Sequence, residues 1–499
     1  MNDTILFIHP GNHRKTYQEL AGEFTAIAPP VWATFLAEHV RRRGIETAIH
    51  DTNVSGWNPG ILETLYGSGV PRLTVVMVYG HNPSASTQTM VPALAIIRDI
   101  KALDPGIQVA IGGLHPNALP EQSLRESGAD FLIRGEGGPA IVGLYEALRK
   151  GRSPDSVPGL AWLDADGRLA ASAPVLPSAN LDADYPANAW DLLPPLALYR
   201  AHNSHTFQFF RYSKKSDFSD VRSPYAVLYT SLGCPFNCSY CCINSLFDRP
   251  RIRYWSLDTV FGWLDRLAAL GVRNVRLDDE LFVLDPKRVE AFCDHVVASG
   301  HRFNFWAYAR VDTIPEPRLL DKMKQAGFDW LCLGIESGNS AVRLGVSKNI
   351  HRDIGTIVRQ IQSHGIYILG NYMFGLPDDT LETMQETLDL SIRLNCEFSN
   401  YYSTMAYPGS ALHAQIAATH PEWLPPTLNG WSQHSYECQP LPTKHLTAAQ
   451  VLRFRDDAFD AFFKNETYLS MVRGKFGDAC VDHIRRMTAI RLRRKLYPS

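Results

Sequence analysis

The sequence predicts an α/β protein with two parallel-sheet domains and a helical C-terminal tail. Within the 499 residues, 1–150 and 221–440 both alternate short apolar runs with amphipathic helical patterns. Residues 151–220 instead combine a hairpin pattern with a run rich in Pro, Asp and Ala, and 441–499 reads as helical. A chain this long exceeds what one hydrophobic core usually serves, so separate domains are expected.

The first domain is predicted to be a doubly wound, flavodoxin-like sheet. Helical patterns that end at Gly44 and Gly106 separate its apolar runs, as in βαβ units. In such sheets ligands dock beyond the carboxyl ends of the strands. The expected strands are TILFIHP (4–10), ETAIHDTN (46–53), LTVVMVYG (73–80), QVAIGGLHP (108–116) and DFLIRGEGG (130–138).

The next segment and the second domain follow in order. GLAWLDADGRLAAS predicts a hairpin that turns at Asp166-Gly167, and a linker follows it. From Tyr225 onward, strand–helix units predict a partial or full parallel (β/α) barrel, whose chemistry lies at the carboxyl ends of its strands. The expected barrel strands are AVLYTS (226–231), NVRLDDELF (274–282), FNFWAYAR (303–310), WLCLGIES (330–337), YILGNYMFG (367–375) and FSNYYSTMAYPGS (398–410).

Charge and composition exclude several classes of partner. The formal charge of -2 and pI near 6.8 give no basic field of the kind that attracts nucleic acid, so nucleic acid is not an expected partner. The start of the chain lacks a signal-peptide pattern, and no run of about eighteen apolar residues occurs. We therefore expect a cytoplasmic protein without a transmembrane segment. Five of the nine cysteines are scattered, which disfavours a disulfide framework.

The other four cysteines crowd into SLGCPFNCSYCCINSLF, directly after a predicted strand. Cys234, Cys238 and Cys241 form C-x3-C-x2-C, which supplies three thiolate corners of a cuboidal [4Fe-4S] cluster and leaves one iron without a protein ligand. A structural zinc site would need a nearby fourth ligand, and Cys242 is adjacent to Cys241 and should point away. Buried, inert cysteines are the other alternative. The spacing favours the cluster.

This segment resembles the signature of the radical S-adenosylmethionine (SAM) superfamily, C-x3-C-x-aromatic-C, with Tyr240 at the aromatic position. The resemblance implies that the amino and carboxylate groups of SAM chelate the open iron. It also implies that one electron from the reduced cluster cleaves SAM, and that the resulting 5'-deoxyadenosyl radical abstracts a hydrogen from a small-molecule substrate. The electron would come from an external low-potential donor of the flavodoxin or ferredoxin type.

Later strand ends resemble SAM-binding segments of the same superfamily. Asp279, within the acidic run 278–280, is expected to bind the SAM ammonium, although a solvated acidic turn is the simpler alternative. Arg310 is the candidate partner of the SAM carboxylate. In GIESG, Glu336 would accept hydrogen bonds from the ribose, and Gly338 would allow close backbone approach.

The first domain resembles the cobalamin-binding domain of one large branch of that superfamily. The cobalamin signature is D-x-H-x-x-G, then a Ser, then a Gly-Gly pair, and here Asn53 holds the histidine position. Because an amide is a poor cobalt ligand, we predict cobalamin without a histidine lower ligand. A flavodoxin-like fold that has lost its ligand is the alternative. The expected contacts are Asn53 in DTNVSG, Ser84 (or Ser86), Gly112, Gly113 and, in the loop RGEGG at the same edge, Glu136.

Together these resemblances imply a cobalamin-dependent radical SAM enzyme that functionalises an unactivated carbon, most simply by methylation. A ring-forming oxidative enzyme similar to the anaerobic magnesium-protoporphyrin monomethyl ester cyclase is the alternative. A cobalamin-binding sensor or an electron-transfer protein is a more distant one. A methylthiotransferase is disfavoured because that family needs a second cluster, and no cysteine precedes Cys234.

Overall fold

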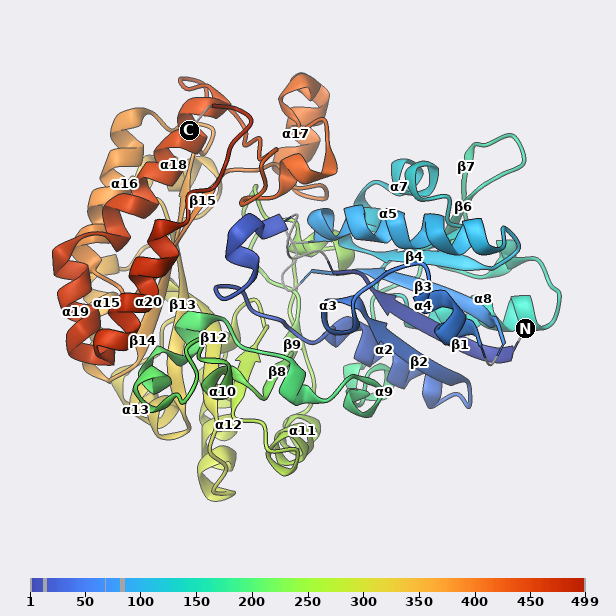
Figure 1. Ribbon diagram of the computed structural model, residues 1–499, viewed down its shortest axis with the longest axis horizontal. Helices are drawn as coiled ribbons and strands as arrows, with labels where there is room; N and C mark the ends of the chain where they lie inside the picture. The colour runs from blue at the N-terminus through green and yellow to red at the C-terminus, as the bar shows by residue number, and fades with distance from the viewer. Residues whose placement is uncertain (1, 12–15, 68, 81–85, 498–499) are drawn as a thin grey trace.

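The computed structural model describes residues 2–11, 16–67, 69–80 and 86–497. Two sheet domains lie side by side, and the C-terminal helices pack on the second (Figure 1). The predicted fold class, a doubly wound domain followed by a parallel partial barrel and a helical tail, is confirmed.

The first sheet has seven strands in the order β2-β1-β3-β4-β5-β6-β7, of which the first five in this order run parallel. Its central strand β1 is almost continuously apolar, as expected for a strand covered on both faces. The strands are β1 (Asn2–His9), β2 (Glu46–Asp51), β3 (Pro71–Val78), β4 (Val109–Gly113), β5 (Phe131–Ile133), β6 (Leu160–Leu163) and β7 (Leu169–Ala171).

The predicted hairpin is present as β6 and β7, and it extends the first sheet. Strand β6 pairs antiparallel with β5, with Leu132 opposite Ala161. Gly167, in the turn, has a φ of 73°, a conformation that favours glycine. The hairpin therefore adds to the sheet of the first domain, and the linker proper follows it. That linker contains α9 (Leu181–Asp184), the long 3-10 segment η6 (Asn203–Tyr212) and α10 (Ser219–Arg222).

Helices cover both faces of the first sheet, as a doubly wound fold requires. Ile96 of α5 and Leu124 of α7 pack in one apolar cluster, whereas Phe35 of α2 and Leu144 of α8 pack in another on the opposite face. Figure 1 shows α5 and α7 on one side of the sheet and α2 on the other. The helices are α2 (Val31–Arg41), α3 (Thr52–Ser55), α4 (Ile61–Tyr66), α5 (Ser86–Leu103), α6 (Leu114–Ala118), α7 (Pro120–Ser127) and α8 (Gly138–Arg149).

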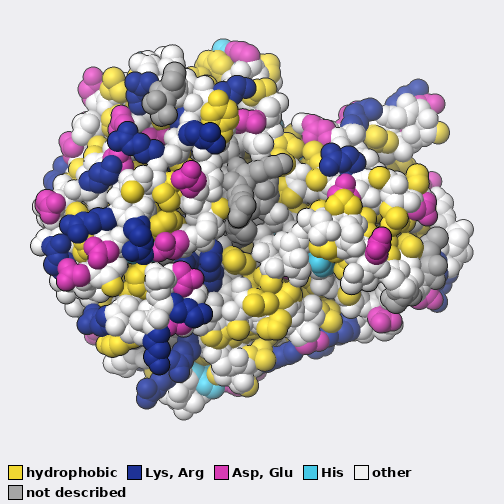
Figure 2. Space-filling model, viewed as in Figure 1, with side chains coloured by type: hydrophobic (Ala, Val, Ile, Leu, Met, Phe, Trp, Pro, Cys, Tyr) yellow, Lys and Arg dark blue, Asp and Glu magenta, His cyan; other side chains and the backbone are white. Residues whose placement is uncertain are grey.

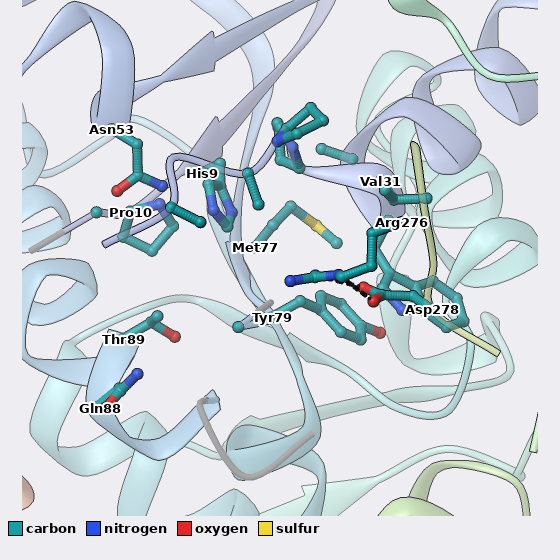
Figure 3. A pocket seen from close by; sticks show the side chains of 18 of the residues that line it. His9, Pro10, Val31, Asn53, Met77, Tyr79, Gln88, Thr89, Arg276 and Asp278 are labelled. Atoms are coloured by element: carbon teal, nitrogen blue, oxygen red, sulfur yellow. Dashed lines mark hydrogen bonds and ion pairs between the residues drawn. The ribbon is translucent and has the colours of Figure 1, made fainter. Parts of the chain in front are cut away.

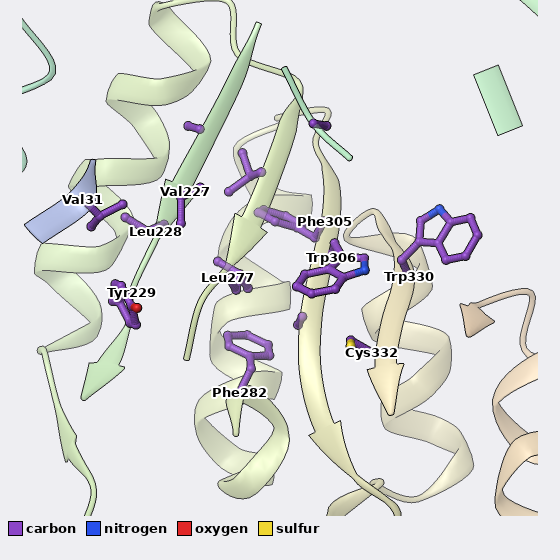
Figure 4. Close-up of a cluster of buried hydrophobic side chains, with 14 of the residues drawn as sticks. Val31, Val227, Leu228, Tyr229, Leu277, Phe282, Phe305, Trp306, Trp330 and Cys332 are labelled. Carbon is purple, nitrogen blue, oxygen red and sulfur yellow. The ribbon is translucent and has the colours of Figure 1, made fainter. Parts of the chain in front are cut away.

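The second domain is a six-stranded parallel sheet in the order β15-β14-β13-β12-β11-β8, and therefore a partial barrel. Large buried side chains pack against the sheet (Figure 4): Phe282 and Phe305 contact Phe292 of an outer helix, and Trp330 contacts Phe207 of η6. All six strands were predicted. They are β8 (Tyr225–Leu228), β11 (Asn274–Leu277), β12 (Asn304–Arg310), β13 (Phe328–Glu336), β14 (Tyr367–Phe374) and β15 (Phe398–Ser403).

A helix follows most barrel strands and packs outside the sheet. Several begin at polar N-caps; the Asp285 side chain, for example, accepts hydrogen bonds from the backbone N–H groups of Lys287 and Arg288. A short antiparallel hairpin, β9 (Ser231–Leu232) with β10 (Arg253–Tyr254), encloses the cysteine loop. The outer helices are α11 (Leu257–Ala269), α12 (Pro286–Ala298), α13 (Pro317–Gln325), α14 (Ser340–Gly345), α15 (Ile354–Ser363) and α16 (Leu381–Leu394).

The two domains share one continuous apolar core. Phe35 of α2 stacks on Trp255 at 5.1 Å between ring centroids, and Trp32 lies against Phe247. This contact brings the carboxyl ends of the strands of both sheets toward the same region of the molecule.

The C-terminal helices pack against the last barrel strand, β15, and against η6 of the linker. Within residues 16–27, which join β1 to α2, Glu23 forms a hydrogen bond with His483 at 3.0 Å and an ion pair with Arg486 at 2.7 Å. Among the described residues, no helix is long and apolar enough to cross a membrane. Acidic and basic side chains intersperse over the helical face of the barrel (Figure 2). The helices are α17 (Ala411–Thr419), α18 (Ala448–Phe463), α19 (Glu466–Phe476) and α20 (Asp478–Ala489).

Candidate functional site

A cavity of about 440 Å³ occupies the inside of the partial barrel. The cysteine loop, the carboxyl ends of the strands and the connection from β1 to α2 all contribute to its wall. Aromatic side chains form a large part of the lining. They include Tyr17, Phe24, Tyr225, Tyr229, Tyr240, Trp306, Tyr308, Phe398, Tyr401, Tyr402, Tyr407 and Phe459.

The cysteine loop holds three half-buried thiols, Cys234, Cys238 and Cys241, whereas Cys242 is buried. Cys241 and Cys242 line this cavity. Burial raises the pKa of the Cys234 thiol to about 11, so a metal must displace its proton. Among the described residues, ligand atoms of these three cysteines do not meet within the 4.8 Å that a single ion would require. A cuboidal cluster spreads its thiolates wider than one zinc ion does, so the donor set fits a cluster better.

Arg310 lies directly beside the cysteine loop. Its guanidinium donates to the Cys238 sulfur at 3.6 Å and to the Asn349 carbonyl at 2.8 Å, and it covers the Phe236 ring at 4.0 Å. The side chain is buried, and its Nε has no hydrogen-bond partner. A buried guanidinium with an unused donor beside the cysteine loop is chemically suited to a carboxylate ligand.

In the acidic run after β11, Asp279 and Glu280 have different surroundings, and Asp279 is not the one that faces the cavity. Asp279 accepts hydrogen bonds from the Thr230 N–H at 2.9 Å, the Thr230 hydroxyl at 2.7 Å and the Ser231 hydroxyl at 2.5 Å, so it ties the end of β11 to β8. It does not line the cavity. Glu280 does, and burial raises the pKa of its carboxyl to about 8. Glu280 rather than Asp279 therefore faces the cavity.

Glu336 lines the same cavity and forms a buried ion pair with Lys348 at 2.9 Å. The backbone of Glu336 has a φ of 67°, a conformation that non-glycine residues seldom adopt and that clusters at functional sites. A Cβ at Gly334 would lie 2.8 Å from a Glu336 carboxylate oxygen, so glycine there leaves room for the pair. Tyr240 also lines the cavity, where its ring packs near Val342 and Leu412.

Gly338, in contrast, is explained by packing. A Cβ there would lie 2.7 Å from the Glu386 carbonyl oxygen, and the Gly338 N–H donates to the Thr387 hydroxyl at 2.8 Å. The glycine thus allows α16 to approach the end of β13. It does not line the cavity.

A second cavity lies between the two domains, where the strands of both sheets end (Figure 3). His9, Asn53 and Tyr79 contribute to it from the first domain, and Arg276 and Asp278 reach it from the barrel. A Cβ on Gly11 would lie 1.9 Å from the Asn53 amide oxygen, so this glycine leaves a cradle for the amide. Asn53 therefore lines this cavity.

Arg276 and Asp278 form a fully buried pair, with Nε to Oδ1 at 2.5 Å and Nη2 to Oδ2 at 2.7 Å. Burial is the largest influence on the Asp278 carboxyl and raises its pKa, while Arg276 opposes this shift. The guanidinium also lies over the Trp306 ring at 5.7 Å. Both residues line both cavities, as do Tyr17, Ala26, Gln88 and Tyr229.

The remaining residues predicted to contact cobalamin surround this region without lining the second cavity. Glu136 forms an ion pair with Arg253 of β10 and accepts a hydrogen bond from the Ser178 N–H at 2.9 Å, so it holds the linker and the cysteine-loop hairpin to the first domain. Ser84 lies outside the described residues. Its alternative, Ser86, is buried and donates to the Val78 carbonyl.

Packing within the sheet requires glycine at Gly113 and leaves little room for a side chain at Gly112. A Cβ on Gly112 would touch Ile133 at 3.3 Å, and one on Gly113, whose φ is 137°, would lie 2.1 Å from the Val78 carbonyl oxygen.

We expect Gly113→Ala to destabilise the first domain by at least about 2 kcal/mol, because it combines backbone strain with a collision against β3. Urea unfolding measures this. Gly128→Ala is the control, because Gly128 also has positive φ but has open space around its Cβ. Equal losses in the two variants would contradict the collision and leave only strain.

Sequence reasoning missed Arg276, Lys348 and the role of Glu280. Arg276 and Asp278 stand two positions apart at the end of a strand, and this period-2 spacing could have placed them together. Lys348 comes twelve residues after Glu336 with a helix between them, so no local sequence pattern predicts this ion pair.

Two family models match the chain. The B12 binding domain model matches residues 18–144, and the Radical SAM superfamily model matches residues 228–391. The two matches fall on the first sheet and on the barrel, and so on the two sides of the second cavity.

Several known proteins resemble most of the chain. An uncharacterized methyltransferase of Pyrococcus horikoshii is 26% identical over 444 residues, which is 87% of this chain and 88% of that protein. The anaerobic magnesium-protoporphyrin IX monomethyl ester cyclase of Rubrivivax gelatinosus is 24% identical over 419 residues, which is 83% of this chain and 70% of the cyclase.

Solved structures share the fold. The cobalamin-dependent S-adenosylmethionine radical enzyme OxsB, with aqua-cobalamin and S-adenosylmethionine bound, superposes with a TM-score of 0.69 at 14% identity, covering 97% of this chain and 72% of OxsB. The radical S-adenosylmethionine methyltransferase TsrM of Kitasatospora setae, with cobalamin and a [4Fe-4S] cluster bound, gives a TM-score of 0.65 at 18% identity, covering 84% of this chain and 75% of TsrM.

Proposed function

Because the chain belongs to the proteins that join a B12-binding domain to a radical SAM domain, we propose that it is a cobalamin-dependent radical SAM enzyme that methylates an unactivated carbon of a small molecule. One observation carries the proposal. The cavity beside the cysteine loop and the cavity of the first domain share a wall, formed by Tyr229, Arg276 and Asp278 among others. A substrate in the barrel would therefore face both cofactors, which a group transfer between them requires.

The residues of the barrel divide into cluster ligands and SAM ligands. Cys234, Cys238 and Cys241 would hold a [4Fe-4S] cluster. Arg310 offers a cation for the SAM carboxylate, and Glu280 offers a carboxylate acceptor for the N–H groups of the SAM amino nitrogen. When bound, the cluster and SAM supply a 5'-deoxyadenosyl radical, and cobalamin supplies a methyl group.

Glu336 and Tyr240 complete the pocket. The Glu336 carboxylate is held by Lys348 through one oxygen, which leaves the other available to a ribose hydroxyl. Tyr240 lies on the cysteine loop and faces the cavity, where its ring would limit the access of water. These roles follow from position, burial and charge.

In the first domain, Asn53 would lie toward cobalamin with its amide in the cradle left by Gly11. Since an amide is a weak cobalt ligand, the cobalt would lack a histidine ligand from this position. Glu136, Gly112 and Gly113 act indirectly, by fixing the loops and strands that surround the cavity.

An electron must come from outside the chain, and we propose a low-potential donor of the flavodoxin or ferredoxin type. Pro235 and Asn237 are exposed on the cysteine loop, so a partner can approach the cluster site without crossing the barrel.

Product analysis tests the proposed reaction. Reconstituted protein, a low-potential reductant, SAM and extracts of a host that lacks the gene would be incubated, and nucleoside products quantified. Methylation predicts S-adenosylhomocysteine alongside 5'-deoxyadenosine. 5'-Deoxyadenosine alone would contradict methylation and favour an oxidative cyclase, an alternative supported by the similarity to the Rubrivivax enzyme. If neither S-adenosylhomocysteine nor 5'-deoxyadenosine formed, both the methylase and the cyclase proposals would be overturned.

We expect Glu280→Gln to weaken SAM binding by about 10- to 100-fold, the usual value of a hydrogen bond to a charged group. Since burial raises the pKa of Glu280 to about 8, its carboxyl is mostly protonated at pH 7, and accepting a hydrogen bond from the SAM amino group favours the ionised form. The affinity of the native chain should therefore rise between pH 6 and 7.5.

Isothermal titration of the cluster-loaded protein with SAM measures both effects. Glu290→Gln, which changes an exposed glutamate paired with Lys322 on the outer helices, is the matched control and should behave as the native chain. An unchanged affinity in Glu280→Gln, or a flat pH profile in the native chain, would remove Glu280 from the SAM site.

A further inference from the structure

A cluster of side chains that could bind a metal ion lies on the outside of the barrel, separate from both cavities. Asp265 of α11, His295 of α12 and His301 of the loop before β12 belong to it, and none of them lines either cavity. Helices α11 and α12 lie next to each other at the lower edge of Figure 1.

The ligand atoms of this triad converge. The Nε2 atoms of His301 and His295 lie 2.7 Å and 3.2 Å from the same Asp265 oxygen, Oδ1. All three ligand atoms lie within 4.8 Å of one another, which is unique to this trio among the described residues. Ligands held at about 2.0–2.1 Å around one tetrahedral zinc ion stand roughly 3.3 Å apart, so only small movements would admit an ion.

Packing fixes both imidazole rings. The His295 ring stacks on Phe261 at 4.0 Å with an interplanar angle of 3°, and the His301 ring meets Phe303 edge-on at 5.8 Å. Both histidines are about four-fifths buried, while the Asp265 side chain is 55% exposed. The site is thus largely pre-organised but open to solvent on the carboxylate side.

We propose that Asp265, His295 and His301 form a binding site for one divalent transition-metal ion, with zinc the best match to two imidazoles and one carboxylate. Water would complete the coordination on the open side, as in zinc sites with three protein ligands. The ion would join α11 to α12 and to the chain that enters β12. This site is independent of the proposed reaction.

A hydrogen-bonded Asp–His arrangement without metal is the competing explanation, and the chain contains a matched example. His364 contacts Asp321 at 2.6 Å, with side-chain exposures of 19% and 59%, which are nearly those of His301 and Asp265. That pair lacks a second histidine. It therefore controls for the effects of removing a half-buried histidine from an aspartate.

The test is zinc titration by calorimetry of the full chain in which Cys234, Cys238 and Cys241 are replaced by alanine, so that the cluster thiols cannot compete. We expect one zinc ion per chain. His295→Ala/His301→Ala should weaken binding at least about a hundredfold, because even outer-shell partners of metal ligands are worth about 10- to 100-fold. His364→Ala should bind as the parent does, and zinc should raise the melting temperature of the parent but not of the double variant.

Absence of stoichiometric binding, or equal binding in the double variant and the His364→Ala control, would overturn the site. If the cysteine-free chain does not fold, the same comparison can be made on cluster-loaded protein. Zinc retained after dialysis, counted per chain by mass spectrometry, should then fall by one in His295→Ala/His301→Ala alone. An unchanged count would overturn the proposal equally.

Discussion

Cys238→Ala is expected to abolish cluster assembly and reduce turnover below detection. A three-thiolate site has no spare ligand, so removing one corner leaves only two protein ligands for four irons. Cys238 also touches Arg310 at 3.6 Å, so its loss disturbs the edge at which SAM would bind. Loss of the visible absorption of the reconstituted cluster, together with loss of 5'-deoxyadenosine formation, measures the effect.

Cys242→Ala is the matched control, because Cys242 is the neighbouring buried cysteine and the nearest alternative ligand. It should retain iron, absorption and turnover, with a modest loss of stability from the small void left in the core. Retention of the cluster in Cys238→Ala, or its loss in Cys242→Ala, would mean that the ligands have been assigned wrongly.

Arg276→Leu is expected to destabilise the protein by about 3–5 kcal/mol, because it strands the Asp278 carboxyl in the wall between the two cavities. Arg276→Leu/Asp278→Leu should recover most of that loss, since no unpaired charge remains. Urea unfolding of the native chain, both single variants and the double variant completes the cycle.

The pH dependence of this cycle has a definite sign. Without Arg276 the pKa of the buried Asp278 rises further, because burial already raises it and Arg276 opposes the shift. The folded state then holds the proton to higher pH than the unfolded state does, so the stability of Arg276→Leu should fall as pH rises from 5 to 8. A constant difference from the native chain, or a double variant as unstable as the single one, would contradict a tight buried pair.

The strands of both sheets were predictable because their apolar runs are long and bounded by glycines and polar turns. The cysteine loop was predictable because its spacing is local and its chemistry is specific. The pairing of the predicted hairpin with β5 could not be predicted. Antiparallel addition to a sheet edge depends on a partner strand about thirty residues away, which no local sequence pattern identifies. The predicted domain boundaries stay a prediction.

Residue roles were harder to predict than elements. Asp279 and Glu280 are neighbours of the same chemical type, and only the direction in which the loop turns after Leu277 decides which one meets the cavity. Glu136 is bound by Arg253, 117 residues further along the chain, and Glu336 by Lys348. Such partners emerge only from the tertiary fold, so the SAM and cobalamin contacts remain predictions to be tested residue by residue.

If the proposed function is correct, the cysteine loop holds a cluster with one iron open to SAM. The most direct measurement is the electron paramagnetic resonance spectrum of the reduced, anaerobically reconstituted protein, with and without SAM. We predict about four irons per chain and a spectrum that shifts when SAM is added. Bound zinc in place of iron, or a four-iron cluster whose spectrum ignores SAM, would contradict it.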